Sequence, residues 1–480
     1  MAAAQLILPA GCTRKPAEAK PQNIVLVITD DQSWDSIGYA SGGRVKSPEL
    51  DGLAASGTTF DAAYCNSMPC VPSRASLTTG VHHHRWPQQR RTDKVVAIRP
   101  GAWTWAHALR AAGYSTALVG KMHYMPRQAP HGFDYMALCE HWPASFRDKV
   151  ILRLDGWRRS LSESALYEPM AASSRKRGGF SAKPWAFAPE HHRISWVRDR
   201  AIEFLDESRA TERPFALTVS FSAPHSPYDP APEFAALYDP KDVEVPTDGW
   251  ADMVGIPESV RNVPAIFTRD KVPTKKIREM LASYRALVSQ VDAAVGAIAK
   301  HVDPADTLVV FCSDHGDYLG KRGQLLKDPG IPFDDVAQVP MFAYGAGVPE
   351  GRMFTEPVSL VDLAPTFLTA AGLEPPAHLD GIALQDRFAG AEMPADRPVY
   401  CFGRAGFDMI RVGELKYFRS HDGSVEMLFD VDQDPRELRN IAQDPAQQTA
   451  RAELAARLAA VLERAPEQAP GFGRHSVRLA

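Results

Sequence analysis

Apolar and polar residues follow two alternating patterns along the chain from residue 23 onward. Short apolar runs, typical of buried strands, alternate with longer stretches in which apolar residues return every three or four positions, which is typical of amphipathic helices. Helices are expected at residues 48–56, 103–112, 195–207 and 275–301. The alternation predicts an α/β fold in which helices flank a large, mostly parallel sheet.

Four of the apolar runs end at ionisable residues. The runs and the residues that follow them are 23–28 with Asp30 and Asp31, 115–119 with Lys121 and His123, 215–221 with His225, and 307–311 with Asp314 and His315. Ligands of open α/β sheets bind at the carboxyl ends of the strands, where these residues would meet. The pattern therefore predicts one shared site at that edge of the sheet.

The pattern changes around residues 375–395, where prolines become frequent. Strand-like runs and then a helical pattern follow at 398–402, 409–412, 416–418 and 446–464. They predict a smaller C-terminal α+β subdomain with a short antiparallel sheet and a closing helix. We therefore divide the chain into a leader or disordered N-terminus, a main α/β domain and the C-terminal subdomain, at residues 1–22, 23–391 and 392–480. The tail at 465–480 is expected to be loosely held.

Composition and charge narrow the class of protein. Apolar residues make up 45% and charged residues 23% of the 480 residues, and 54 basic against 58 acidic side chains give a net charge of −4. These proportions exclude a disordered or collagenous chain and one that coats nucleic acid. No apolar run approaches the roughly 20 residues that span a bilayer, and six cysteines are too few for a disulfide scaffold. We expect a globular chain with a large core, no transmembrane span and no nucleic-acid partner.

The N-terminus poses a question of processing. The apolar stretch at residues 2–11, followed by Cys12, is similar to the end of a bacterial lipoprotein leader, in which Cys12 would carry the lipid. Against this, Pro9 stands where an aliphatic residue is usual, and no basic residue precedes the stretch. A periplasmic or lipid-anchored form and a cytoplasmic form both stay open. No pairing pattern joins Cys65, Cys139 and Cys401, which fits maturation in a reducing compartment.

The most specific segment runs from Cys70 to Gly80. Pro72 and Ser73 are typical of the first turn of a helix, where proline is tolerated and free backbone N–H groups favour anions. Arg74 lies four residues after Cys70 and so returns to the same face of that helix. On its own, the Cys-x-Pro sequence would favour a core cysteine beside an arginine near the start of a helix.

The complete string from Cys70 to Gly80 resembles the signature of the type I, formylglycine-dependent sulfatases, which belong to the alkaline phosphatase-like superfamily. Further segments resemble other motifs of that family, at residues 47–60, 120–123, 224–227, 313–316 and 428–440. The resemblance covers about residues 23–445 and implies an alkaline phosphatase-like fold, with the sulfatase catalytic domain at 23–391. It also implies that a formylglycine-generating maturation enzyme oxidises Cys70.

Asp30, Asp31 and Asp314 are candidate metal ligands. An Asp-Asp pair after a strand is by itself more often a turn, but three carboxylates at one sheet edge would repel each other unless a cation lay between them. The resemblance implies one divalent ion with five ligands: Asp30, Asp31, Cys70 as formylglycine, Asp314 and His315. Oxygen ligands favour Ca²⁺, whereas the imidazole keeps Mn²⁺ as an alternative. Many members have Asn in place of His315, and the Asp-His version resembles choline sulfatases, iduronate sulfatases and phosphonate monoester hydrolases.

The resemblance also implies five catalytic residues besides Cys70, which are Arg74, Lys121, His123, His225 and Lys327. The arginine and the two lysines would stabilise charge on the transferring group. His225 with Lys327 would protonate the leaving alcohol, and His123 would accept the proton of the second hydroxyl of hydrated formylglycine. Lys321 or Arg322 would replace Lys327 if the loop register differs, and the family often has Glu or His where these two residues stand.

These features predict a hydrolase of sulfuric ester bonds, a sulfatase, whose substrate is a small-molecule or oligosaccharide sulfate ester. Three carboxylates, a divalent ion and three cations would give the site a net charge of about +2, which suits an oxyanion ester. Two alternatives stay open: a phosphonate monoester or phosphodiester hydrolase with the same site, and an unmatured protein that only binds polyanions. The sequence does not indicate the oligomeric state.

Three further segments lie outside these motifs. Residues 147–200 hold twelve Lys or Arg against six Asp or Glu, with Trp157 and Trp185 among them. We interpret this segment either as a solvated insertion or as a lid that attracts a sulfated sugar chain and stacks its rings on the tryptophans. His82–His84 are expected in the loop after the Cys70 helix, with one of them at the pocket mouth. Asp334 and Asp335 stay unassigned.

Overall fold

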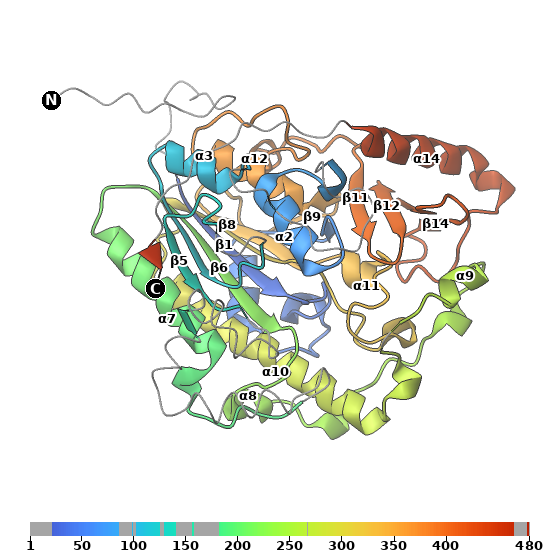
Figure 1. Cartoon of the computed structure of the whole chain (residues 1–480), viewed down its shortest axis with the longest axis horizontal. Helices are drawn as coiled ribbons and strands as arrows, with labels where there is room; N and C mark the ends of the chain where they lie inside the picture. The colour runs from blue at the N-terminus through green and yellow to red at the C-terminus, as the bar shows by residue number, and fades with distance from the viewer. Residues whose placement is uncertain are drawn as a thin grey trace.

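The computed structural model describes residues 22–85, 98, 102–124, 129–140, 156–157, 182–265, 267–464 and 478–479. Its main sheet has nine strands in the order β15-β5-β4-β6-β1-β7-β8-β2-β9, with β1 at the centre (Figure 1). In that order the strands are Arg478–Leu479, Tyr135–Leu138, Ser115–Gly120, Phe215–Pro224, Asn23–Asp30, Thr307–Ser313, Met341–Gly345, Thr58–Phe60 and Arg352–Phe354.

The main sheet is mostly parallel, which confirms the predicted fold class. The central strand β1 pairs in parallel with β6 on one side and β7 on the other, so Val27 lies between Val219 and Phe311. Among the described strands of this sheet, β8 alone runs against the others, because it is antiparallel to both β7 and β2. The parallel pairing brings the carboxyl ends of β1, β4, β6 and β7 to one edge.

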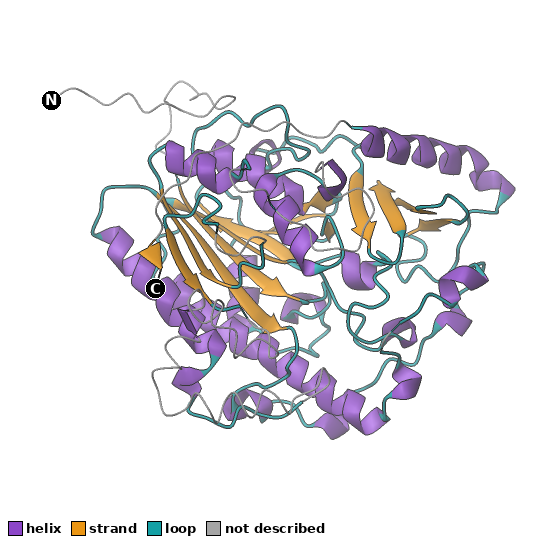
Figure 2. Ribbon diagram, in the orientation of Figure 1, coloured by secondary structure: helices purple, strands orange, loops and turns teal. Residues whose placement is uncertain are grey.

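Helices cover both faces of this sheet because the side chains of a strand point alternately to the two sides (Figure 2). Ile24, Leu26 and Ile28 of β1 pack in one core with α2, α3 and α12, whereas Val25 and Val27 pack in the other with α1, α7 and α10. In chain order these helices are Pro48–Ala55, Cys70–Thr79, Trp105–Ala111, Arg193–Arg209, Thr274–Ala299 and Leu363–Ala370. The four helices expected from the sequence are α1, α3, α7 and α10, with ends shifted by one or two residues.

A four-stranded antiparallel sheet with a closing helix forms the C-terminal part of the chain, again as predicted. Its strands β11-β12-β13-β14 are Val399–Gly403, Phe407–Val412, Leu415–Ser420 and Glu426–Asp430, and the helix α14 is Gln448–Glu463. Tyr400 and Tyr417 on one face pack against Leu454 of α14. Met409 and Phe418 on the other face join the core around α2 and α12. The sequence pattern did not predict β14.

Arg478–Leu479 pair with β5 at the edge of the main sheet, so the prediction of a loosely held tail is wrong for these two residues. The shorter elements are β3 Ala63–Tyr64 paired with β10 Val358–Ser359, and the helices α8 Pro232–Ala235, α9 Glu258–Arg261, α11 Asp334–Ala337 and α13 Gln385–Phe388. Within the described ranges, no helix combines the length and the apolarity that crossing a bilayer requires. Cys12 lies outside the described residues.

Candidate active site

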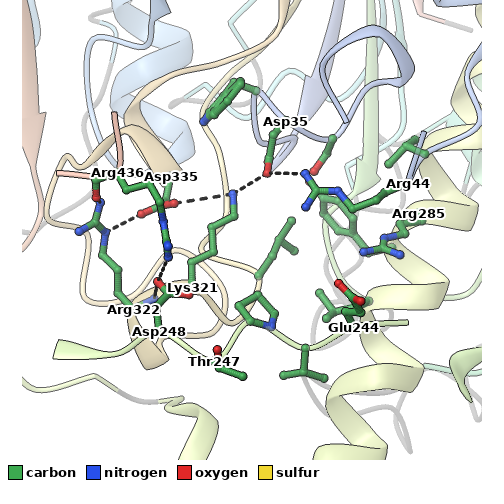
Figure 3. Close-up of a pocket in the computed structure, with 18 of the residues that line it drawn as sticks. Asp35, Arg44, Glu244, Thr247, Asp248, Arg285, Lys321, Arg322, Asp335 and Arg436 are labelled. Atoms are coloured by element: carbon green, nitrogen blue, oxygen red, sulfur yellow. Dashed lines mark hydrogen bonds and ion pairs between the residues drawn. The ribbon is translucent and has the colours of Figure 1, made fainter. Parts of the chain in front are cut away.

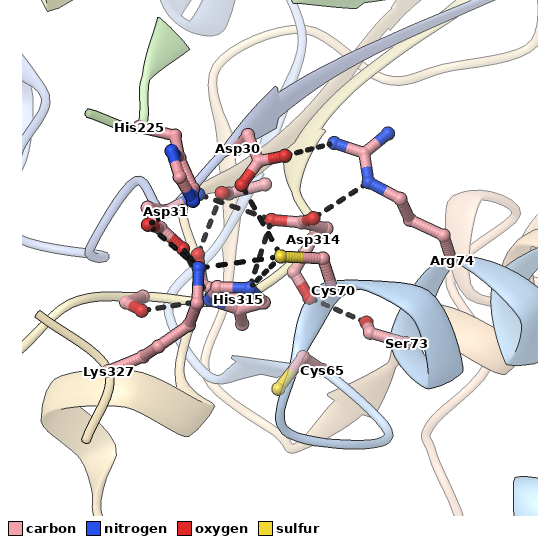
Figure 4. Close-up of polar contacts among 12 residues, drawn as sticks. Asp30, Asp31, Cys65, Cys70, Ser73, Arg74, His225, Asp314, His315 and Lys327 are labelled. Atoms are coloured by element: carbon pink, nitrogen blue, oxygen red, sulfur yellow. Dashed lines mark hydrogen bonds and ion pairs between the residues drawn. The ribbon is translucent and has the colours of Figure 1, made fainter. Parts of the chain in front are cut away.

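Cys70 is the first residue of α2 and only 4% of it is exposed. Pro72 and Ser73 lie in the first turn, as the sequence predicts, and the helix is capped after Thr79 by Gly80, whose φ of 65° is left-handed. Figure 4 shows the Cys70 side chain pointing into a group of carboxylates at the edge of the main sheet. The start of α2 therefore presents the sulfur to the ends of β1 and β7.

The strand register explains why the aspartates meet. Thr29 of β1 lies opposite Ser313 of β7, so Asp30 and Asp314, each one residue further along, emerge side by side. The backbone N–H of Asp31 donates to Asp314 Oδ1 at 3.2 Å and ties the two strand ends together. The carboxylates predicted to share one sheet edge are thus brought together by parallel pairing.

Four buried side chains form a candidate metal centre, with ligand atoms all within 4.8 Å of one another: Asp30, Cys70, Asp314 and His315. Cys70 Sγ lies 3.6 Å from Asp30 Oδ1 and 3.0 Å from His315 Nε2. A second, overlapping group of potential ligands consists of Asp30, Asp31 and His225. Oxygen and nitrogen donors at this spacing, with carboxylates that would otherwise repel each other, fit a divalent cation.

Arg74 holds the carboxylates from the side opposite His315 (Figure 4). Its Nε donates to Asp314 Oδ2 at 2.7 Å and one terminal nitrogen donates to Asp30 Oδ2 at 3.2 Å. The other terminal nitrogen donates to Ser220 Oγ at 2.7 Å and to the Lys121 carbonyl at 3.2 Å. Every nitrogen of the guanidinium is therefore engaged by the protein, which fixes the positions of both carboxylates.

Burial and charge act in opposite directions on the pKa values of this site. Burial alone would raise the pKa of Asp314, but His315, Arg74 and two lysines outweigh it and hold that pKa well below its ordinary value. Burial raises the pKa of the Cys70 thiol to about 12, and the nearby Lys327 lowers it only in part. The unmodified residue is therefore a protonated thiol at neutral pH.

Lys327 is the cation of its loop that reaches the site. Its Nζ lies 2.7 Å from Asp31 Oδ1 and 3.4 Å from Cys70 Sγ. Lys321 instead pairs with Asp35 at 2.8 Å, and Arg322 pairs with Asp335 at 2.5 Å. The structure thus places Lys327 beside Cys70, whereas Lys321 and Arg322 pair with carboxylates outside the site.

Lys121 and His123 follow β4 as predicted. Lys121 Nζ forms an ion pair with Asp30. His123 adopts a φ of 56°, a conformation that is uncommon outside glycine and is found at functional sites. Its backbone N–H and that of Met122 donate to Glu140 Oε1 at 2.6 and 2.9 Å, which holds this turn at the sheet edge.

His225 and Asp31 lie together on the Lys327 side of the site (Figure 4). His225 Nε2 is 3.6 Å from Asp31 Oδ2. Asp31 has a φ of 64°, a left-handed conformation that Asp tolerates better than most residues. The structure therefore brings all three predicted carboxylates, His315, Cys70, Arg74, Lys121, Lys327 and His225 to one edge of the sheet.

Sequence reasoning missed three residues that position the site. Ser220 and Glu140 hold Arg74 and the turn after β4, and the Tyr284 hydroxyl donates to the Asp31 carbonyl at 2.8 Å. Glu140 lies two residues after β5, so the strand-end rule would have found it if that four-residue strand had been recognised. Ser220 and Tyr284 lie within a buried strand and a helix, where nothing in the sequence sets them apart.

Two of the histidines after α2, His82 and His83, are buried against the C-terminal sheet. His83 lies in a short 3₁₀ helix, and its ring packs 4.1 Å from that of Phe402, while the His82 ring lies 5.0 Å from that of Tyr400. These contacts dock the end of α2 onto the C-terminal sheet. Burial lowers the pKa of His82 to about 4 and that of His83 to about 3, so both are neutral at pH 7.

The stacking role considered for Trp157 and Trp185 is wrong. Both side chains are buried, at 3% and 6% exposure, in the core beneath α7 and α10. Their indole N–H groups donate to the carbonyls of His191 and Ala188, at 3.1 Å in each case. The arginine-rich stretches 158–159 and 175–177 lie outside the described residues.

The described cysteines are all free and buried. Cys312 lies in β7, as expected. Cys65 Sγ lies 3.8 Å from Cys401 Sγ, a proximity that no spacing in the sequence indicated. Asp334 accepts a hydrogen bond from the Tyr64 hydroxyl at 2.8 Å and forms an ion pair with Lys416 at 2.5 Å, so it links β3 to the C-terminal sheet.

Comparisons with known proteins agree with this geometry. The family model described as Sulfatase matches residues 22–373, and the model described as N-sulphoglucosamine sulphohydrolase, C-terminal, matches residues 327–464. The choline-sulfatase of Rhizobium meliloti is 30% identical over 453 residues, which cover 90% of this chain and 85% of the relative. The arylsulfatase of Clostridium perfringens is 26% identical over 442 residues, which cover 87% of this chain and 90% of the relative.

Solved structures share the fold. The phosphonate monoester hydrolase of Agrobacterium radiobacter has a TM-score of 0.71 at 23% identity and covers 92% of this chain and 95% of its own. A protein solved in complex with its substrate, D-glucosamine-2-N,6-O-disulfate, has a TM-score of 0.73 at 21% identity and covers 94% of this chain and 100% of its own.

Proposed function

The chain belongs to the sulfatase family and is a hydrolase that acts on sulfuric ester bonds, and we propose that formylglycine made from Cys70 supplies the nucleophile. The position of Cys70 is the observation that carries this proposal: its Sγ lies 3.0 Å from His315 Nε2 and 3.4 Å from Lys327 Nζ. As a thiol, Cys70 has no hydroxyl to deliver. A hydrated aldehyde would carry two hydroxyl groups on the carbon that now bears the sulfur.

A metal ion and formylglycine are general features of the family. We propose that Asp30, Asp31, Asp314 and His315, with modified residue 70, hold one divalent ion. The burial and the mutual repulsion of these carboxylates support a cation there. Ca²⁺ is the proposed ion because three ligands are carboxylates, and Mn²⁺ is the alternative because it accepts an imidazole. When bound, the ion supplies positive charge that stabilises oxyanions of the reacting group.

Residues of the chain then supply the remaining charge. One hydroxyl of the hydrate loses its proton to water and attacks the sulfur, and the bond between sulfur and the leaving oxygen breaks. Lys121 and Lys327 neutralise charge on the transferring group. Arg74 acts through Asp30 and Asp314, because all its nitrogens already donate to the protein.

Two histidines move the protons in this proposal. His225 lies beside Asp31, near the Lys327 ammonium, and with it protonates the leaving alcohol. His123 accepts the proton of the second hydroxyl, so that the bond from residue 70 to the sulfate breaks and the aldehyde is restored. The left-handed turn that holds His123, fixed by Glu140, supports a role that requires a defined position.

A phosphonate monoester hydrolase is the second candidate, favoured by His315 in place of the more usual Asn. The test compares kcat/KM of the matured protein for an aryl sulfate and for the aryl phosphonate monoester with the same leaving group. We expect the sulfate to be the better substrate. Far faster turnover of the phosphonate would reverse the assignment of the preferred ester.

A further inference from the structure

A large pocket, whose lining Figure 3 shows, includes residues of the loops that follow β1 and β7, at the edge of the main sheet where Cys70 lies. Its volume of about 670 Å³ falls within the usual range for small-molecule sites. The walls come from the loop after β1, the loop after β7, the first half of α10, residues 244–248, the start of α11 and residues 435–436. Because α10 precedes β7 and runs back along the sheet, its first turns stand at the carboxyl ends of the strands, where ligands of such sheets bind.

Two loops connect this pocket to the catalytic residues. Asp35 lines the pocket and follows Asp31 by four residues, so their Cα atoms are at most about 14 Å apart. Lys321 lines the pocket on the loop that carries Lys327 to Cys70, and it pairs with Asp35 at 2.8 Å. A ligand that is held at Cys70 and extends by one or two sugar units would reach the pocket.

Most charges in the pocket are already paired within the protein. Arg44 and Lys321 share Asp35, at 3.4 and 2.8 Å. Arg322 pairs with Asp335 at 2.5 Å, and Arg436 pairs with Asp248 at 3.1 Å. These pairs fix the positions of the side chains in the pocket walls. The opposite charges within each pair cancel, so the pairs do not by themselves favour an anionic or a cationic ligand.

Like Glu244, Arg285 is an exception among the described charged residues of this pocket. It is half-buried, and among the described residues no hydrogen bond or salt bridge engages its guanidinium. Figure 3 shows it next to Arg44 on one wall, with Lys321 on the opposite side. Burial and the charge of Arg44 lower the pKa of Arg285, and Tyr238, Asp35 and Glu244 oppose this only in part, so a bound anion would relieve the repulsion between the two arginines. Trp34, which is half-buried, adds aromatic surface of the kind that packs against sugar rings.

We propose that this pocket binds an anionic group on the saccharide unit next to the one that carries the scissile sulfate, with Arg285 and Arg44 as the anion-binding residues. A uronate carboxylate and a second sulfate share the required chemistry, because both present several oxygens to a guanidinium fork. The inference rests on the proposed sulfate-ester hydrolase and narrows its substrate class to sulfated oligosaccharides with more than one anionic group.

The test measures binding to the full chain with Cys70→Ala, which cannot turn over a substrate. Calorimetry compares three probes: a disaccharide with two sulfates, a disaccharide with one sulfate and a uronate, and 4-nitrophenyl sulfate. Adding Arg285→Gln is expected to weaken at least one disaccharide about 10-fold or more and to leave 4-nitrophenyl sulfate unchanged. The disaccharide that loses affinity identifies the anionic group. Lys276→Gln, an exposed cation of α10 paired with Glu279 at 3.0 Å, is the matched control and should change none of the three.

Equal weakening of all probes by Arg285→Gln, no weakening of either disaccharide, or no binding of either disaccharide would overturn the proposal. Thermal unfolding checks that the variant is folded, and Arg285→Lys, which keeps the charge, should retain part of the affinity. The catalytic proposal is tested separately, by assaying hydrolysis of a sulfate ester. If the matured wild-type protein hydrolyses no sulfate ester while disaccharide binding still depends on Arg285, the catalytic proposal fails and the pocket assignment stands.

Discussion

Arg74 Nε donates to Asp314 Oδ2 at 2.7 Å in a site where the arginine side chain is 1% exposed and the aspartate is fully buried. Both charged groups are buried away from water, so the guanidinium and the carboxylate stabilise each other. Asp30, which the same guanidinium contacts at 3.2 Å, adds to this stabilisation. The pair joins the start of α2 to the end of β7 and thereby sets Cys70 against the proposed metal ligands.

Replacing Arg74 with Met should strongly destabilise the fold. Asp30 and Asp314 would be left buried without their shared cation, which typically costs about 3–5 kcal/mol of unfolding free energy. Urea denaturation measures this loss. Arg110→Met is the control, since Arg110 pairs with Asp134 at a 38% exposed surface site and should cost about 1 kcal/mol or less. Equal losses in the two variants would show that the buried pair does not organise the site.

Lys327→Met should lower kcat for a small aryl sulfate about 100-fold, because the proposed partner of His225 in proton transfer is removed. The matched control is Arg404→Gln, which removes an exposed cation paired at 3.4 Å with Asp328, the next residue along the chain. The control should retain the wild-type kcat. Near wild-type turnover by Lys327→Met would contradict the placement of this lysine in the reaction.

Some of the site was predictable because local patterns determine it. Asp30, Asp31, Asp314 and His315 follow short apolar runs, and parallel pairing of those runs is enough to bring them together. The loop from Gly316 to Lys327 was not predictable in the same way. Its path depends on the left-handed backbone conformation of Leu319 and Arg322. Contacts with the surrounding protein impose this conformation, and nothing in the sequence predicts it.

Other features depend on contacts between segments far apart in the chain. Ser220 meets Arg74 because the register of β4 and β6 places Ser220 beside Gly120, where a Cβ would lie 1.9 Å from the Ser220 carbonyl oxygen. Trp157 and Trp185 looked like a stacking surface in the sequence, but packing against α7 and α10 buries them. The composition of this segment did not show that tertiary packing encloses these two aromatic residues.

Removal of the divalent ion by a chelator should lower the unfolding temperature, and Ca²⁺ should restore it more than Mn²⁺ does at equal concentration. A ligand that binds only the folded state stabilises it in proportion to RT ln(1 + [L]/Kd). His315→Asn, which replaces the imidazole with an oxygen donor, should increase the preference for Ca²⁺. A larger gain with Mn²⁺ in the wild-type protein would reverse the assignment of the ion.

Asp292 should make stability depend on pH. It is 3% exposed, accepts the Leu50 N–H at 2.7 Å, and its burial raises its pKa to about 7. The folded state keeps this proton to a higher pH than the unfolded state does, so the free energy of unfolding should fall as pH rises from about 4 to about 7, by about 1.4 kcal/mol per unit of pKa difference. Asp292→Asn keeps an acceptor but does not titrate. Urea denaturation at several pH values tests this, and parallel curves for the two proteins would contradict it.

The central claim is that formylglycine at residue 70 performs the hydrolysis of a sulfate ester. The most direct measurement is mass spectrometry of the peptide that contains Cys70, made on preparations with different extents of maturation, each assayed for turnover of one aryl sulfate. The account predicts that kcat per polypeptide rises in proportion to the fraction of formylglycine and vanishes for the thiol. Full activity in protein with an entirely unmodified Cys70, or no sulfatase activity in fully converted protein, would contradict it.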